Sequence, residues 1–212
     1  LGFAGTLAAG AGANIDEGDR AFLSDPDCHE VAVEDLTRSI EAAADAGAET
    51  VISTVGPNVD TLPDDAQHRA IVSVYRDIAP VAERHGVTVV VEPLNRRVNH
   101  PGYYLDSSFE AYEIVQAVDS PKVKVLFDIY HQQITEGDVI RNIREHVADI
   151  GHIHIADNPG RNEPGTGELA YERVFEAIAD AGYEGYVGCE FSPTRDPDAV
   201  LAEVAAMADR AR

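Results

Sequence analysis

Short apolar runs alternate with longer amphipathic segments along most of this chain, and this alternation constrains the fold more than any other feature. Runs typical of buried strands occupy Thr50–Gly56, Val87–Glu92, Val123–Asp128, Ile150–Ile155 and Tyr186–Glu190. Helical periodicity occupies Val33–Ala46, Ala66–Arg84, Ser107–Val118, Asp138–Val147, Tyr171–Ala181 and Asp198–Ala211. Strand and helix in regular alternation indicate parallel βαβ units. No linker or low-complexity segment divides residues 1–212, so we expect one α/β domain.

The position of the polar residues decides between an open doubly wound sheet and a barrel. A dinucleotide-binding sheet carries G-x-G-x-x-G after its first strand, and no helix-opening glycine follows Gly10-Ala11-Gly12. Four of the expected strands instead carry a metal-ligand residue type at the carboxyl end: Glu92, Asp128, His154 and Glu190. In a (β/α)8 barrel the carboxyl ends of the strands meet at one mouth, which holds the active site. The sequence therefore predicts an α/β fold of the (β/α)8 TIM-barrel type.

The barrel is expected to be incomplete in this chain. Leu1–Ala4 has the composition of a strand end, and with it we count about six strands where a full barrel has eight. We expect the absent part to be the first two βα units, about 50 further residues before Leu1.

The four strand-end residues predict a metal site when they are taken together. A single carboxylate at the end of a strand often caps a helix or pairs with an arginine. An apolar barrel, however, does not bury three unpaired carboxylates, because each would lose its hydration. A divalent cation held by Glu92, Asp128, His154 and Glu190 would neutralise them. Three oxygen ligands and one imidazole suit Mn²⁺, Mg²⁺ or Co²⁺ better than a structural zinc.

The charge excludes one class of partner. The chain has 38 acidic and 16 basic residues, a formal charge of −22, which repels the phosphate backbone of a nucleic acid. This charge is typical either of an ordinary solvated surface or of a halophilic protein, in which dissolved ions screen the self-repulsion. No apolar run approaches the roughly 20 residues of a membrane helix. Cys28 and Cys189 are far apart and match no disulfide framework, and Leu1–Thr6 has no signal-peptide pattern, so a cytoplasmic location is expected.

Several segments together resemble the hydroxypyruvate isomerase family, within the xylose isomerase-like TIM barrels. The resemblance covers residues from about 50 to about 195 and is carried by Val91–Asn95, Pro101–Leu105, Phe127–His131, Gly151–Asp157, Pro159–Arg161, Glu163–Glu168 and Gly188–Phe191. It implies a divalent metal on the four strand-end residues, with His131 and Arg161 holding substrate oxygens. One position departs from the family, because hydroxypyruvate isomerase-like proteins usually carry Gln where this chain has His154. The ketose 3-epimerases of the same superfamily carry His there.

The resemblance and the residue chemistry imply a proton transfer beside a carbonyl group. Glu92 and Glu190 are the candidate catalytic residues, because one carboxylate can remove a carbon-bound proton while the other returns one. His131, expected at the start of a loop, can bond a substrate hydroxyl or enediolate oxygen, and Arg161 can clamp a carboxylate. Asn95 is expected to orient Glu92 or the substrate.

These observations leave four hypotheses for the function. The first is a metal-dependent aldose–ketose isomerase of hydroxypyruvate or a similar small hydroxy-carbonyl acid, in carbohydrate metabolism. The second is a ketose 3-epimerase with the same ligands, which the His154 departure favours. An AP-endonuclease-type nuclease would need more histidine ligands and a basic groove, and a non-catalytic sugar-binding barrel would be expected to lose a ligand. The expected partner is a small molecule, with no nucleic acid and no membrane, and a homo-oligomer is left open.

Overall fold

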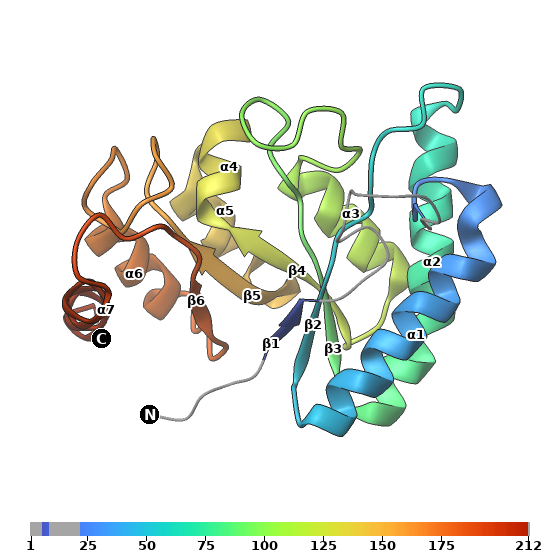
Figure 1. Ribbon diagram of the computed structural model, residues 1–212, viewed down its shortest axis with the longest axis horizontal. Helices are drawn as coiled ribbons and strands as arrows, with labels where there is room; N and C mark the ends of the chain where they lie inside the picture. Colours follow the sequence, from blue (N-terminus) through green and yellow to red (C-terminus); the bar gives the residue numbers. More distant parts are fainter. Residues whose placement is uncertain (1–5, 9–21, 212) are drawn as a thin grey trace.

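The computed structural model describes residues 6–8 and 22–211, in which six parallel strands form one curled sheet (Figure 1). Each strand pairs with the next one along the chain, in the order β1-β2-β3-β4-β5-β6. The strands are β1 (Thr6–Ala8), β2 (Thr50–Ser53), β3 (Thr88–Val91), β4 (Val123–Asp128), β5 (Ile150–Ile155) and β6 (Val187–Cys189). Parallel strands that pair in sequence order are typical of a (β/α) barrel. In this structure they form an open sheet.

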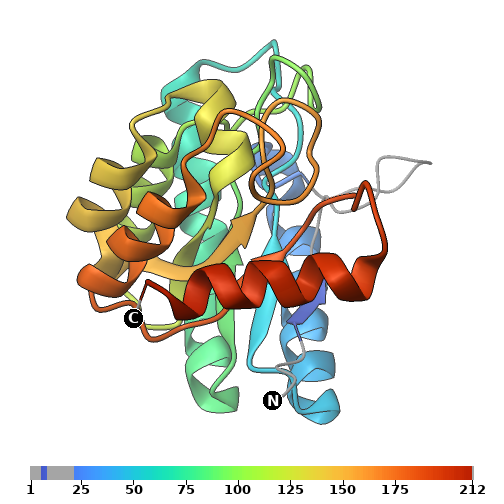
Figure 2. The ribbon, with the colours of Figure 1, turned by 90° about the vertical axis from the view of Figure 1, so that its left-hand side faces the viewer.

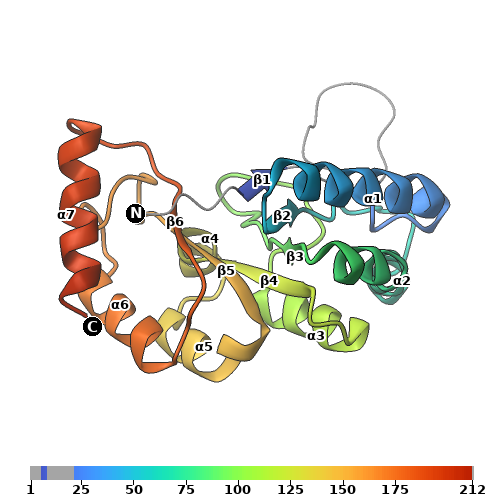
Figure 3. The same ribbon diagram turned by 90° about the horizontal axis from the view of Figure 1, so that it is seen from below.

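Helices follow the strands, and most of them cover the outer face of the curl, which is clearest from below (Figure 3). They are α1 (His29–Ala46), α2 (Asp64–His85), α3 (Ser108–Val118), α4 (Ile129–Thr135), α5 (Val139–His146), α6 (Tyr171–Asp180) and α7 (Pro197–Asp209), with 3₁₀ turns at Pro26–Cys28 and Val147–Asp149. Figure 2 shows α7 as a long helix beyond β6, beside α6. The loops that follow the strands gather at the top of Figure 1, so this end of the sheet holds the barrel mouth.

Strand residues alternate between two environments because successive side chains point to opposite faces. Val89, Val91, Val125, Phe127 and Ile153 are fully buried in the hydrophobic core that the sheet shares with the outer helices. The residues between them face the concave side, and this places the polar strand-end residues on one surface.

Strands β2 to β6 and most of the helices occupy the regions that the sequence predicts, and the expected barrel fold with about six strands is confirmed. Strand β1 lies at Thr6–Ala8, after the position at which the first strand was expected to end. The expectation that His131 begins a loop is wrong, because it lies in the short helix α4. This helix forms because the Asp128 carboxylate accepts hydrogen bonds from the backbone N–H groups of Tyr130 and His131, at 2.8 and 3.1 Å. The strand end expected at Leu1–Ala4 and the Gly10–Gly12 loop lie outside the described residues, and the residues expected before Leu1 stay a prediction.

Among residues 6–8 and 22–211, no helix combines the length and the apolarity that crossing a membrane requires.

Candidate metal and substrate site

The four residues predicted as ligands come together at the carboxyl ends of four neighbouring strands. Asp128 ends β4 and His154 lies in β5, while Glu92 and Glu190 directly follow β3 and β6. The backbone N–H groups of Glu92 and Glu190 still bond to the preceding strands, at 3.0 Å to Ser53 and 3.1 Å to Ile155. One ligand atom from each of the four residues lies within 4.8 Å of all the others. The register of the strands in the sheet therefore brings these four residues together.

Two of these ligand atoms are buried without a hydrogen-bond partner among the described residues: Asp128 Oδ2 and His154 Nδ1. His154 Nδ1 lies 3.2 Å from Glu190 Oε2 and 3.9 Å from Glu92 Oε1. A buried polar atom without a partner costs free energy, so these atoms point to an absent group that they would bind.

Burial and neighbouring charges shift the pKa values of the three carboxylates in different directions. Burial, and then the charges of Asp128 and Glu190, raise the pKa of Glu92 well above its usual range. Burial and the charge of Glu190 likewise raise the pKa of Asp128 to about 7. Burial also opposes ionisation of Glu190, but contact with His154 and the charge of Arg161 outweigh it and lower the pKa of Glu190 to about 2. Perturbed pKa values of this kind cluster at functional sites.

The donor set fits a divalent cation. Three carboxylates and one imidazole supply oxygen and nitrogen ligands from four strands, with free ligand atoms on Asp128 and His154. This set suits Mn²⁺, Mg²⁺ or Co²⁺. The positive charge of such an ion would offset both the burial and the repulsion that raise the pKa values of Glu92 and Asp128.

Arg161 reaches into the cluster from the loop after β5. Its Nη2 atom lies 2.6 Å from Glu190 Oε2 and 3.7 Å from Asp128 Oδ2, and its guanidinium carbon lies 5.2 Å from the centre of the Tyr130 ring. The loop is held by the fully buried Asp157, whose carboxylate accepts backbone N–H bonds from residues 158, 165 and 169. A side chain on a loop fixed in this way keeps its place without help from regular secondary structure.

His131 and Asn95 lie beside the cluster and contact each other. His131 is fully buried, and burial lowers its pKa to about 3, so its imidazole is neutral. Its Nε2 atom faces Asp128 Oδ2 at 3.8 Å, whereas Nδ1 contacts the backbone and side-chain nitrogens of Asn95. The Asn95 side chain is also fully buried and bonds to its own turn at residues 98–99.

Several residues of the site were not predicted from the sequence. Tyr130 stacks beneath Arg161, and the His100 ring centre lies 5.3 Å from that of His131. Asp157 and Glu163 were part of the family resemblance but had no assigned role. The Asp157-Asn158-Pro159-Gly160 sequence is typical of a turn with side-chain-to-backbone bonds, so it could have indicated the role of Asp157. No sequence pattern indicates the contact of Tyr130 with Arg161 or that of His100 with His131.

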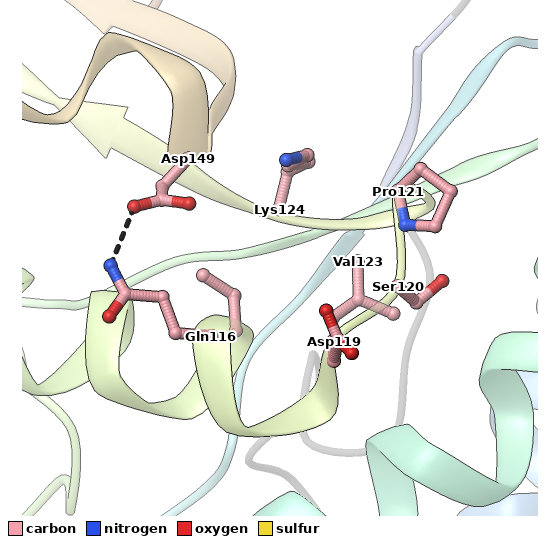
Figure 4. Close-up of a pocket in the computed structure, with 8 residues that line it drawn as sticks. Gln116, Asp119, Ser120, Pro121, Val123, Lys124 and Asp149 are labelled. Carbon is pink, nitrogen blue, oxygen red and sulfur yellow. Dashed lines mark hydrogen bonds between the residues drawn. The ribbon is translucent and has the colours of Figure 1, made fainter.

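A second hollow lies at the opposite end of the strands, around the amino ends of β4 and β5 (Figure 4). Several of its polar groups are paired with protein atoms. Gln116 donates a hydrogen bond to Asp149 at 2.8 Å, and the Lys124 ammonium donates to the Ala148 carbonyl at 2.9 Å. This hollow offers no cluster comparable to the one at the mouth.

Comparison with known proteins agrees with the geometry. Residues 11–210 match the family model described as xylose isomerase-like TIM barrel. A 2-oxo-tetronate isomerase of Cupriavidus necator is 37% identical over 170 residues, which cover 78% of this chain and 64% of that protein. The hydroxypyruvate isomerase of Escherichia coli is 30% identical over 184 residues, covering 87% of this chain and 71% of that protein.

Among solved structures, one described as an AP endonuclease, family 2, from Brucella melitensis superposes with a TM-score of 0.82 at 33% identity, covering 89% of this chain and 72% of the other. This chain thus spans about two thirds of the length of several of the proteins it matches. The chain belongs to the xylose isomerase-like TIM-barrel family, in the group that includes hydroxypyruvate isomerase.

Proposed function

We propose that the chain carries the active site of a metal-dependent aldose–ketose isomerase that acts on a small hydroxy-carbonyl acid of the hydroxypyruvate or 2-oxo-tetronate type. The observation that supports this most is the convergence of four ligand atoms within 4.8 Å on four adjacent strands. The substrate class is suggested by the names of the two isomerases that share 37% and 30% of their aligned residues with this chain.

Glu92, Asp128, His154 and Glu190 would hold the ion, which we propose to be Mn²⁺, Mg²⁺ or Co²⁺. A bound divalent cation supplies Lewis-acid polarisation of the substrate carbonyl.

Proton transfer is the task of Glu92 and Glu190. They follow strands β3 and β6, with β4 and β5 between them, so a substrate in the mouth has a carboxylate on either side. One carboxylate takes the proton from the hydroxymethyl carbon, which leaves an enediolate. The other returns a proton to the former carbonyl carbon, and the hydroxyl proton passes to the former carbonyl oxygen. Hydroxypyruvate becomes tartronate semialdehyde with no net change in atoms or electrons.

Arg161 and His131 bind the substrate in this proposal. Both contacts of Arg161 with the carboxylate cluster use Nη2, and the side chain is 28% exposed. Its other N–H groups can therefore reach a substrate carboxylate. The neutral His131 ring presents Nε2 toward the cluster, where it can bond an oxygen of the substrate.

Activity of the full-length protein tests the proposal. With Mn²⁺ we expect turnover of hydroxypyruvate or a 2-oxo-tetronate, and we expect it to be abolished in Glu190→Gln and in Asp128→Asn while circular dichroism shows that both variants are folded. Asp138→Asn, which changes an exposed carboxylate between α4 and α5, serves as the matched control. Full activity in Glu190→Gln would refute the site assignment.

A ketose 3-epimerase is the second candidate, and His154 is the residue that favours it. The same carboxylate pair would then remove and return the proton at one carbon, on opposite faces. A panel of free ketoses beside the two acids separates the candidates, because the epimerase inverts C3 of a ketose without needing a substrate carboxylate. A nuclease is disfavoured by the charge of −22, and a non-catalytic barrel by the presence of all four ligands.

We further propose that residues 1–212 belong to a single xylose isomerase-like domain of a salt-adapted, cytoplasmic protein. The continuous sheet order supports the single domain. The charge of −22 supports the salt adaptation, and the lack of a disulfide framework supports the cytoplasm.

A further inference from the structure

The two nitrogens of the His131 ring lie in different surroundings. Nδ1 lies 3.1 Å from the backbone nitrogen of Asn95 and 2.6 Å from its side-chain Nδ2 atom. Nε2 is buried and has no hydrogen-bond partner in the described part of the chain. Because a backbone N–H can only donate, Nδ1 must accept and carries no hydrogen. The one N–H hydrogen of the ring must therefore be on Nε2.

The contacts of the Asn95 side chain also indicate that Nδ1 of His131 accepts, because other hydrogen bonds fix the orientation of the Asn95 amide. Its Oδ1 atom accepts the backbone N–H bonds of Val98 at 3.0 Å and Asn99 at 3.2 Å. Its Nδ2 atom donates to Asn99 Oδ1 at 3.0 Å, and the same oxygen accepts the Tyr130 hydroxyl at 3.0 Å. A flipped amide would place an oxygen against Asn99 Oδ1 and an NH₂ group against two N–H donors. Nδ2 is therefore the group that faces His131.

We propose that Asn95 is a positioning residue that fixes His131 as the Nε2–H tautomer, with its hydrogen aimed at the substrate site. The role in binding substrate rests on the proposed function, whereas the tautomer rests only on the contacts of Asn95. His131 then acts solely as a donor. It binds a carbonyl or enediolate oxygen and cannot take a proton from the substrate, so the proton transfers are left to the carboxylates.

Nuclear magnetic resonance of the ¹⁵N-labelled, full-length protein without substrate tests the tautomer directly. Long-range ¹H–¹⁵N correlations distinguish protonated from unprotonated ring nitrogens, and the His131→Gln variant identifies the His131 signals. We expect Nδ1 of His131 at the unprotonated shift and Nε2 at the protonated one. A protonated Nδ1, or a mixture of the two tautomers, overturns the inference, and this result does not depend on activity. If the expected spectrum accompanies a protein without isomerase activity, the inference stands and the proposed function fails.

Two variants separate the contact to His131 from the wider network. In Asn95→Asp, one oxygen still accepts the turn N–H bonds while the other faces Nδ1 without a hydrogen to donate. Nδ1 then keeps only the backbone N–H of residue 95, so we expect the single Nε2–H pattern to give way to a mixture of the two tautomers. In Tyr130→Phe, the bond to Asn99 is lost but the ring and the contact between Asn95 and His131 remain, so the His131 signals should keep their wild-type pattern. An unchanged His131 spectrum in a folded Asn95→Asp variant would show that the Asn95 side chain does not fix the tautomer, and it would overturn the positioning role. If that variant does not fold, the wild-type spectrum still decides the question.

Discussion

The two carboxylate oxygens of Asp128 have different roles. Oδ1 caps α4 by accepting two backbone N–H bonds, whereas Oδ2 is buried without a hydrogen-bond partner among the described residues. Two other buried carboxylates, Asp157 and Glu163, use both oxygens as hydrogen-bond acceptors. The difference separates a group that is ready to bind a ligand from groups whose role is to hold loops, although all three are acidic residues in or near the barrel mouth.

Glu163 should make the stability depend on pH. Its Oε2 accepts the backbone N–H of Thr194 at 2.9 Å and its Oε1 accepts the Thr194 hydroxyl at 2.6 Å, and these bonds lower its pKa to about 2. A carboxyl whose pKa is lower in the folded state stabilises the fold above its unfolded pKa, which is about 4.3. This stabilisation is lost as the pH falls from about 4.3 toward 2.

We therefore expect Glu163→Gln to lower the melting temperature at pH 7, and the difference from wild type to shrink steadily below about pH 4. Thermal unfolding followed by circular dichroism across this range measures it. A difference that is the same at pH 7 and pH 3 would contradict the role of the ionised carboxylate.

Secondary-structure elements were predictable where they are long and periodic. The apolar runs predicted β2 to β6, and because parallel strands end at one edge, they also predicted which residues would meet there. Helix α4 was not predictable from periodicity, since it has less than two turns and depends on the Asp128 cap. The contacts of Arg161 with Glu190 and Tyr130 could not be predicted from the sequence either. They depend on how Asp157 shapes the loop after β5, which is a tertiary effect.

Gly188 in β6 has no side chain, and this makes room for His154. A Cβ atom at residue 188 would lie 2.9 Å from Cδ2 of His154 and 3.0 Å from Nε2 of His152. We expect Gly188→Ala to displace the His154 ring and to weaken Mn²⁺ binding by about 10- to 100-fold, measured by calorimetric titration. Cys189→Ala, which changes the next residue on the opposite face of the strand, is the control and should bind Mn²⁺ as wild type does. Equal affinity in the two variants would show that His154 does not need this space.

At the scale of the whole molecule, an open six-stranded sheet is enough to assemble the cluster, because its four members come from adjacent strands β3 to β6. The chain has a formal charge of −22, and few of the acidic residues that the structure describes are buried, so most of them lie on the surface. Charges of one sign on a compact surface repel one another unless ions screen them.

Salt should therefore stabilise the protein. If the surface is adapted to high salt, the melting temperature rises steeply between dilute buffer and about 1 M KCl, where the screening length falls to roughly 3 Å. A salt series followed by scanning calorimetry measures this rise. A melting temperature that does not change across the series leaves only an ordinary solvated surface.

The binding of a metal ion to the four strand-end residues is the central claim, and calorimetric titration with Mn²⁺ tests it most directly. The full-length protein is first stripped of metal with a chelator and then compared with Asp128→Asn, which keeps an oxygen to cap α4, and with the exposed control Asp138→Asn. We predict about one Mn²⁺ ion bound per chain by the wild type and by Asp138→Asn, with binding lost or weakened at least about 10-fold in Asp128→Asn. Unchanged affinity and stoichiometry in a folded Asp128→Asn variant would contradict the account.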